Sequence, residues 1–556
     1  MSATPAEVPV PRPRWRKPGG LGWVALITPA VIVAPILVVV GYVFQPGQSS
    51  LEHLFGTVLP EYVWSTLLLM LGVAAGVISI GVTSAWLVTV YRFPGQRVLE
   101  WALVLPLAMP AYVMAYAYTD WLQYAGPVQT TLRELTGWGA RDYWFPEIRS
   151  LWGAAAMFSF ALYPYVYLLA RTAFLEQSRS AIETARLAGY GAWGSFWRAG
   201  LPLARPAIAA GSALALMETL ADFGTVSYFA VQTFTTGIFR AWLSFGDIVG
   251  AAQLATCMLA FVFLLLWMER HHRGAARYQS NAPRRPLPPR QLRGRQAVVA
   301  SLACCAPVVF GFFLPAGVLI NLTIRERESI WVERVLTLVT NSFTLAGVTA
   351  LAAVLLAVLI AYATRLSKHP AVNAANRLAS LGYAIPGAVI AIGILIPLAR
   401  FDNILADLVE NAFGVDIGLL FTGTILALVY AYLVRYLAVA LQTVDAGLAK
   451  ITPSMDDAAR SLGLGPARTL RRVHAPMLWG SMLTAGLLVF VDVMKELPAT
   501  FALRPFNFDT LAIEAFNLTK DERLAEAALP SLLIVAVGLL PLIIISRRMT
   551  RDRARR

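Results

Sequence analysis

Apolar residues along this chain fall into long blocks, and polar residues gather between the blocks. A helix rises about 1.5 Å per residue, so roughly 20 apolar residues are needed to cross about 30 Å of hydrocarbon. The pattern predicts an all-α membrane protein with about 12 transmembrane helices. The expected spans are residues 21–43, 63–90, 99–123, 150–171, 206–229, 248–269, 297–320, 341–364, 374–400, 417–441, 477–499 and 524–546.

The composition supports a membrane protein, because 58% of the 556 residues are hydrophobic and only 14% are charged. The net charge of +14 would suit a nucleic-acid partner. However, the Lys and Arg residues lie between the apolar blocks and at the chain ends, so we expect membrane lipid and no nucleic acid. Cys257, Cys304 and Cys305 fall inside apolar segments, which predicts small buried side chains and no disulfide framework.

The first apolar block is predicted to be an uncleaved span, because it is longer than the core of a signal peptide and no small-residue cleavage site follows it. Alternate connections between the spans carry most of the Lys and Arg residues, as cytoplasmic loops do. We therefore expect both termini to be cytoplasmic.

Residues 270–295 hold eight arginines and four prolines without apolar periodicity. This composition predicts a flexible cytoplasmic linker, with contact to anionic lipid as a second interpretation. The predicted organisation is a cytoplasmic tail, a first transmembrane domain, a basic linker, a second transmembrane domain and a second cytoplasmic tail. These segments cover residues 1–20, 21–269, 270–296, 297–546 and 547–556.

An internal repeat follows the fourth span of each half at a constant offset of 274 residues. The repeated pattern is an acidic residue with small neighbours, then a glycine, and then a proline. Because six spans return the chain to the same side, the halves are predicted to be two parallel six-helix repeats. The candidate residues of the two loops are Glu183, Ala185, Gly189, Leu201, Pro202, Asp457, Ala458, Ala459, Gly463 and Pro476.

The residue types of this loop predict a short helix, a turn and a re-entry into the membrane. The acidic residue suits the positive end of a helix dipole, and glycine permits a sharp turn. Pro202 and Pro476 stand where the fifth span begins, and a proline costs little there. The alternative is an ordinary amphipathic helix at the membrane surface.

This repeated pattern resembles the signature loop of permease subunits in bacterial binding-protein-dependent ABC importers. The chain departs from the family pattern at Thr184, Ala199, Asp457 and Ala475. The resemblance implies the type I importer permease fold and a place in the bacterial cytoplasmic (inner) membrane. It also implies that each loop docks on an ABC ATPase and that an extracytoplasmic binding protein delivers the substrate.

The chain has no phosphate-binding loop of its own, since that loop needs a Gly-Lys pair and none occurs. We therefore expect no enzymatic activity and no cofactor bound by this chain. The ATP would be used by a separate ATPase, two copies of which match the two loops.

Four acidic residues lie within the predicted fifth spans, where charges are costly and invite a functional explanation. Glu218 and Asp222 stand four residues apart, and the same offset relates them to Asp492 and Glu496. That spacing would place each pair on one helix face, lining a central path for a cation. The alternative is that Lys495 and Arg435 neutralise these acids and that all of them only pack the helices.

Residues 105–118, 217–229 and 495–505 also resemble the ferric-iron branch of these permeases, and the resemblance covers nearly the whole chain. Ferric iron prefers oxygen donors, which the four acids supply. No compact His/Cys group suggests a stable metal site. Permeases for thiamine, polyamines or phosphonates share the architecture and remain alternatives. A secondary transporter or channel would not require the paired loops, and a structural scaffold would leave the acids unexplained.

Overall fold

The computed structural model describes most of the chain as α-helix. The described residues are 20–45, 56–139, 141–176, 189–273, 290–326, 332–367, 369–380, 382–416 and 418–554. Nearly all of the predicted N-terminal tail and most of the linker therefore lie outside them. One short parallel pair of strands joins β1 (Tyr91–Arg92) to β2 (Arg290–Gln291). Cys257, Cys304 and Cys305 are free.

The helices of the first half overlap the predicted spans, except that the third span is divided and the fifth ends early, and additional short helices lie between them. Within the described residues they are α1 (Gly20–Tyr42), α3 (Leu59–Val90), α4 (Gln96–Ala102), η1 (Leu105–Ala108), α5 (Ala111–Leu122), α6 (Pro127–Thr136), α7 (Leu151–Glu176), α9 (Ala192–Ser195), η2 (Phe196–Gly200), α10 (Leu201–Ala221), α11 (Gly224–Tyr228), α12 (Phe234–Phe239), η3 (Arg240–Ser244) and α13 (Ile248–Arg273).

The second half repeats this order of elements. Its described elements are α14 (Gly294–Val308), η4 (Val309–Phe313), α15 (Leu314–Arg325), α16 (Val332–Leu366), α17 (Pro370–Ala379), η6 (Gly382–Ala384), α18 (Gly387–Phe413), α19 (Ile425–Leu448), α20 (Pro453–Ser461), α21 (Pro466–Thr469), η7 (Leu470–His474), α22 (Ala475–Met494), α23 (Pro498–Leu503), α24 (Leu511–Lys520) and α25 (Leu524–Ala554).

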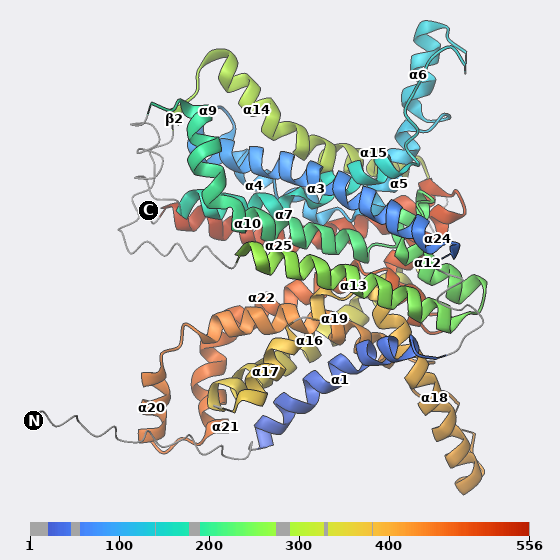
Figure 1. Cartoon of the computed structure of the whole chain (residues 1–556), viewed down its shortest axis with the longest axis vertical. Helices are drawn as coiled ribbons and strands as arrows, with labels where there is room; N and C mark the ends of the chain where they lie inside the picture. Colours follow the sequence, from blue (N-terminus) through green and yellow to red (C-terminus); the bar gives the residue numbers. More distant parts are fainter. Residues whose placement is uncertain are drawn as a thin grey trace, which may run out of the picture.

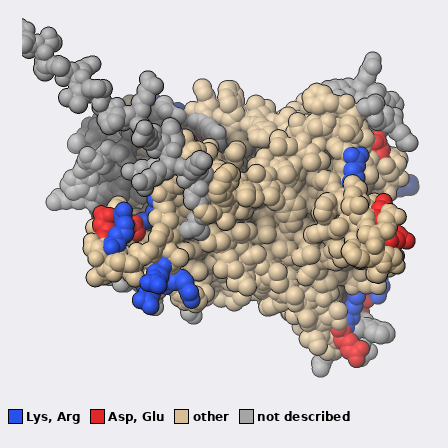
Figure 2. Space-filling view, turned by 90° about the horizontal axis from the view of Figure 1, so that it is seen from below, with Lys and Arg blue, Asp and Glu red and all other residues tan. Residues whose placement is uncertain are grey.

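Among the described residues, 11 helices are long and apolar enough to cross a membrane, and one bent pair brings the number to 12. The predicted all-α fold with about 12 spans is confirmed. Helices α9 and α21, at equivalent places in the two halves, lie at the same end of the molecule, as parallel repeats require (Figure 1). Figure 2 shows charged side chains near two opposite ends of one face and an uncharged band between them.

The two halves exchange their first spans. Helix α1 packs against α16, α17 and α18 of the second half, while α14 and α15 pack against α3, α4 and α5 of the first. The hydroxyl of Tyr430 in α19 donates to the carbonyl of Val31 in α1 at 2.6 Å. In the opposite direction, the hydroxyl of Tyr118 in α5 donates to the carbonyl of Phe310 in η4 at 2.7 Å. Each half therefore completes the helical bundle of the other.

The third span of each half is broken, contrary to the prediction of continuous helices over residues 99–123 and 374–400. In the first half, the segments on either side of the break meet at an angle of 92°. Pro110 directly precedes α5, and Pro386 directly precedes α18. Proline disfavours a helical conformation in the residue before it and donates no backbone hydrogen bond, so these positions begin new helices.

Candidate functional site

The second signature loop, residues 457–476, has the predicted helix, turn and re-entry. Asp457, Ala458 and Ala459 lie in α20, where Ala459 is buried against the protein. Gly463 then takes a positive φ of 77°, and Pro476 stands in the first turn of α22. Position 463 favours glycine because other residues strain in this left-handed conformation.

The first signature loop, residues 183–202, is described only from its glycine onward. Glu183 and Ala185 lie outside the described residues. Gly189 has a φ of 85°, and Leu201 and Pro202 open α10. A Cβ built on Gly189 or on Gly463 would meet no other atom within 4 Å. The need for glycine at both turns is therefore a matter of backbone conformation and not of space.

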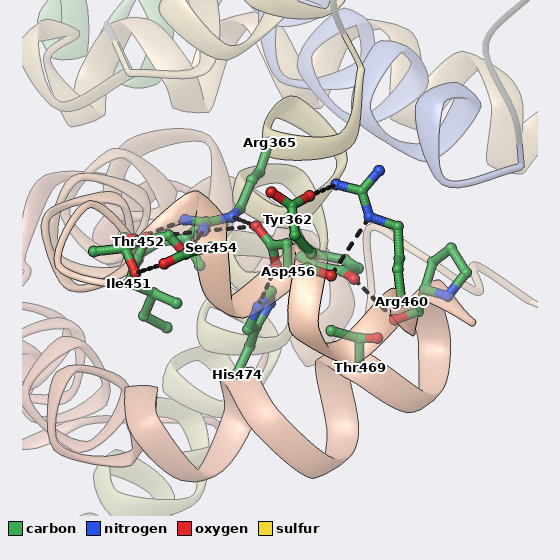
Figure 3. A network of polar contacts seen from close by, with 12 residues as sticks. Tyr362, Arg365, Ile451, Thr452, Ser454, Asp456, Arg460, Thr469 and His474 are labelled. Carbon is green, nitrogen blue, oxygen red and sulfur yellow. Dashed lines mark hydrogen bonds and ion pairs between the residues drawn. The ribbon is translucent and has the colours of Figure 1, made fainter. Parts of the chain in front are cut away.

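A network of polar side chains centred on Asp456 supports the second signature loop (Figure 3). Nε of Arg365, near the end of α16, donates to Oδ2 of Asp456 at 2.8 Å. The same guanidinium donates to the carbonyl oxygens of Leu448 at 2.9 Å and Ile451 at 2.8 Å. On the other side of Asp456, Nε2 of the buried His474 lies 2.7 Å from Oδ1.

This network ties α20 to two membrane helices. Arg365 belongs to α16, Asp456 to α20, and His474 immediately precedes α22. The hydroxyl of Tyr362, one turn before Arg365, also donates to the carbonyl of Pro466 at 2.9 Å and holds α21. Short polar contacts therefore connect α20 directly to α16 and to the start of α22.

The fifth spans end earlier than predicted, and this corrects the expected placement of the acids. Helix α10 ends at Ala221 and α22 ends at Met494, so Asp222 and Glu496 lie beyond the helices that hold Glu218 and Asp492. The i, i+4 pairs therefore do not share one helix face. The reason is local, because a carboxylate that accepts hydrogen bonds from amides further along the chain competes with helix continuation.

Asp222 and Glu496 hold the start of the next short helix in the same way. Oδ1 of Asp222 accepts from the backbone amides of Thr225 at 2.8 Å and Val226 at 3.3 Å. Oε1 of Glu496 accepts from the amide of Ala499 at 2.8 Å, and Oε2 accepts from that of Thr500 at 3.0 Å. Both acids thus satisfy helix-start amides that have no partner within the helix.

The remaining two acids lie beside cationic side chains. Nζ of Lys495 is 2.9 Å from Oδ1 of Asp492. Arg435 of α19 places Nη2 at 3.7 Å from Glu218 and Nη1 at 3.7 Å from Glu496. The structure therefore has the neutralising contacts that the packing alternative describes. It also brings acids of both halves to one guanidinium.

The break of the third span of the first half and the breaks of both fifth spans face one cavity of about 100 Å³. Non-helical backbone at membrane depth is tolerated where it is buried in protein or lines a cavity, and broken spans in transporters form substrate sites. A second cavity of about 690 Å³ shares Tyr165 with the first. Among the residues that line the smaller cavity are Pro110, Tyr112, Tyr165, Glu218, Asp222, Gly224, Arg435, Lys495, Glu496 and Pro498.

Three of the four predicted acids line this cavity. The fourth, Asp492, does not line it but forms an ion pair with Lys495, which does. Within the described ranges, no three His, Cys, Asp or Glu side chains are grouped closely enough to hold a metal ion. The sequence reasoning missed the broken third spans. The signal was present, because Pro110 and Pro386 interrupt apolar segments at corresponding places in the two halves.

Two stretches of the chain, residues 77–277 and 353–552, match the model of the family described as the binding-protein-dependent transport system inner membrane component. The chain belongs to this family. It is a multi-pass inner-membrane permease of an ABC importer and is not an enzyme. In such systems a partner ATPase hydrolyses the ATP, and a binding protein brings the substrate.

Several relatives of this permease are known. It is 28% identical to the Fe(3+)-transport system permease protein FbpB 2 of Haemophilus influenzae, over 96% of this chain and 99% of the relative. The molybdenum transport system permease protein ModB of Escherichia coli is 28% identical over 39% of this chain and 99% of its own length. A solved bacterial ABC transporter that imports alginate matches 46% of this chain and 96% of its own, with 15% identity and a TM-score of 0.33.

Proposed function

We propose that this permease moves ferric iron, delivered by an extracytoplasmic binding protein, across the inner membrane. The observation that carries the proposal is the match to the Fe(3+) permease FbpB 2, which extends over both halves and 96% of the chain. The sulfate and molybdenum relatives match 34% and 39% of the chain. Agreement over both halves is the stronger guide, because the central cavity is built from both.

The chemistry of the cavity is compatible with a hard cation. Glu218, Asp222 and Glu496 bring carboxylate oxygens to its wall, and Tyr112 and Tyr165 bring phenol oxygens. Trivalent iron prefers oxygen ligands. The carboxylates are already partnered by amides or by Arg435, which favours brief passage over stable retention.

We infer that the ATPases dock on the two signature loops and that their movements reach the membrane helices through these loops. One ATPase copy docks on Gly189 and its neighbours and a second on Asp457 to Gly463, with both chain termini on this cytoplasmic side. Closure of the ATPases would move α20, and the network around Asp456 would carry that motion to α16 and α22. The cavity would then open alternately to the two sides of the membrane.

A second candidate is an oxyanion such as a phosphonate, and a specific observation favours it. Arg435 and Lys495 bring two positive charges to the cavity wall. A relative named as a 2-aminoethylphosphonate permease of Salmonella typhimurium is 30% identical over 28% of this chain.

Uptake of labelled ferric iron into vesicles that contain this chain, its ATPase and its binding protein tests the proposal. We expect ATP-dependent uptake of iron, and transport of a phosphonate without iron would overturn the iron assignment. Glu218→Gln and Asp222→Asn should each lower transport more than they lower the amount of protein in the membrane. Glu333→Gln, an exposed acid at the start of α16, is the matched control. If only expression falls in the cavity variants, these acids are structural.

A further inference from the structure

Arg435 is a buried cation placed between acids of the two halves. It lies in α19 of the second half and is 6% exposed. Glu218, 3.7 Å away, belongs to the first half, and Glu496, also 3.7 Å away, belongs to the second. One guanidinium thus contacts carboxylates on both sides of the boundary that must open during transport.

Arg435 lies beside two carboxylates but is separated from each by more than hydrogen-bond distance. Both 3.7 Å separations exceed the range of about 2.7–3.2 Å that is usual for a hydrogen bond. Nε of Arg435 is buried and has no hydrogen-bond partner among the described residues. A buried guanidinium normally uses its five donors, so this one has capacity left for a different arrangement.

Gly387 leaves the space that this arrangement needs. A Cβ at that position would stand 2.7 Å from Oε1 of Glu496 and 3.2 Å from Nη1 of Arg435. At the first distance, any side chain at position 387 would force the carboxylate of Glu496 to shift. The backbone at the start of α18 therefore approaches the ion pair as closely as it does only because residue 387 is glycine.

The cations of the cavity all come from one half. At the repeat offset, Arg435 corresponds to Ala161 and Lys495 corresponds to Ala221, and both alanines line the same cavity. The first half supplies acids without counter-ions. The two halves therefore contribute unequally to the charge of the cavity, because the cations that neutralise the acids of both halves come from the second half.

We propose that Arg435 is a tethered counter-ion that occupies the place of the cationic cargo between Glu218 and Glu496 and so keeps small cations from leaking through the resting permease. The inference rests on the proposed transport of a cation. When the halves separate, Glu218 leaves Arg435, while Glu496 stays with it in the second half. Glu218 is then the carboxylate released for the cargo, because Glu496 is still held by the amides of α23.

The test is passive sodium flux in liposomes that contain the full permease with its ATPase, without ATP, binding protein or iron. Arg435→Gln should raise the sodium leak by about tenfold, since an uncompensated charged path concentrates counter-ions by this order. Adding Glu218→Gln to Arg435→Gln should return the leak close to the wild-type rate. Arg523→Gln, which removes an exposed arginine paired with Glu526, is the matched control and should leave the flux unchanged.

An Arg435→Gln permease with the sodium flux of the wild type would overturn the proposal. A sodium flux through the Arg435→Gln, Glu218→Gln double variant as high as that through Arg435→Gln alone would also overturn it. Should Arg435→Gln fail to assemble with the ATPase, Gly387→Ala answers the same question, because its Cβ displaces the pair without removing a charge. An assembled Gly387→Ala permease that stays tight to sodium also overturns the proposal. The assay contains no iron, so its outcome is separate from that of the iron-uptake experiment.

Discussion

The two signature loops share one motif, but the membrane helices beneath them support the loops by different chemistry. In the second half the support is polar, with Arg365, Asp456 and His474 in contact. In the first half the corresponding region is aromatic. The ring centroid of Trp86 lies 4.9 Å from that of Phe196 and 5.1 Å from that of Phe174.

The two halves differ in which of two contacting positions carries the large side chain. At the repeat offset, Trp86 corresponds to Ile360, and Gly200 corresponds to His474. A Cβ on Gly200 would stand 2.7 Å from Cζ3 of Trp86, so the tryptophan fills the space that the histidine fills in the other half. Duplication preserved the shape of the support and not its chemistry, so the two halves should respond differently to the same kind of change.

The largest expected effect is on the polar support. Arg365→Met removes the contacts with Asp456, Leu448 and Ile451 and leaves the carboxylate poorly compensated, so the free energy of unfolding should fall by about 3 kcal/mol. Denaturation in detergent measures this. Arg460→Met is the control from the same loop, because its pair with Asp457 is exposed and worth at most about 0.5 kcal/mol. Equal effects of the two substitutions would contradict the assigned role of Arg365.

The aromatic support should respond to added volume. Gly200→Ala places a methyl group against Trp86 and should lower the free energy of unfolding by about 2 kcal/mol, as overpacking does. Trp86→Ile, which installs the residue of the other half, should recover part of that loss when combined with Gly200→Ala. The same denaturation experiment decides the point, and a combined variant less stable than Gly200→Ala would refute this exchange of the large side chain between the two positions.

Substitution of the loop glycines should have similar effects in the two halves. Gly189→Ala and Gly463→Ala each force a side chain into the left-handed region at a cost of roughly 1 kcal/mol. The double variant should lose ATPase association in a pull-down and still insert into the membrane. Gly137→Ala is matched to them, because Gly137 has a φ of 72° and open surroundings but lies outside the loops. Retained association in the double variant would count against docking.

The smallest expected effect is at the opposite end, where Arg149 of the first half contacts Glu522 of the second at 2.8 Å. The hydrogen bond from Arg149 lowers the pKa of Glu522 below its usual value of 4.5. A lowered carboxyl pKa stabilises the fold above the usual value, and this stabilisation is lost as the pH falls through the lowered pKa. Because Glu522 is largely exposed, the contribution is at most about 0.5 kcal/mol after screening.

Comparing the stability of the wild type and Glu522→Gln at neutral and acidic pH measures this contribution. The gap between them should close on acidification. The repeat offers no second copy of the contact, since the corresponding residues are Gly423 and Ile248. A gap that stays constant with pH would show that Glu522 acts without its charge.

Much of the architecture was predictable because it depends on local properties of the chain. The length of each apolar block is set by the thickness of the bilayer, and the 274-residue offset exposed the duplication. The turn at Gly463 was also predictable, since a glycine after a short helix commonly ends it in the left-handed conformation. The broken spans were missed because residues 99–123 and 374–400 are mostly apolar, and hydropathy does not distinguish a straight span from a bent one.

The candidate site was predictable only in part. Glu218, Asp222 and Glu496 were chosen as costly charges within apolar segments, and all three line the cavity. Their assumed helical spacing was wrong, because Asp222 and Glu496 hold the amides of the helices that follow them. Arg435 was predicted as a possible partner of these acids, but its position between an acid of each half was not predictable, because Glu218 and Glu496 lie far from it in the sequence.

By itself, the sequence determined the class of protein, the number of spans, the parallel repeat and the paired loops. These follow from hydrophobic length, an even span count and a motif that folds within its own neighbourhood. Only the tertiary structure decided that the halves exchange their first spans, that three helix breaks meet at one cavity, and that one arginine serves acids of both halves. The physical reason is that helices within a membrane associate through close packing and polar contacts between distant residues, which leave no periodic signal along the chain.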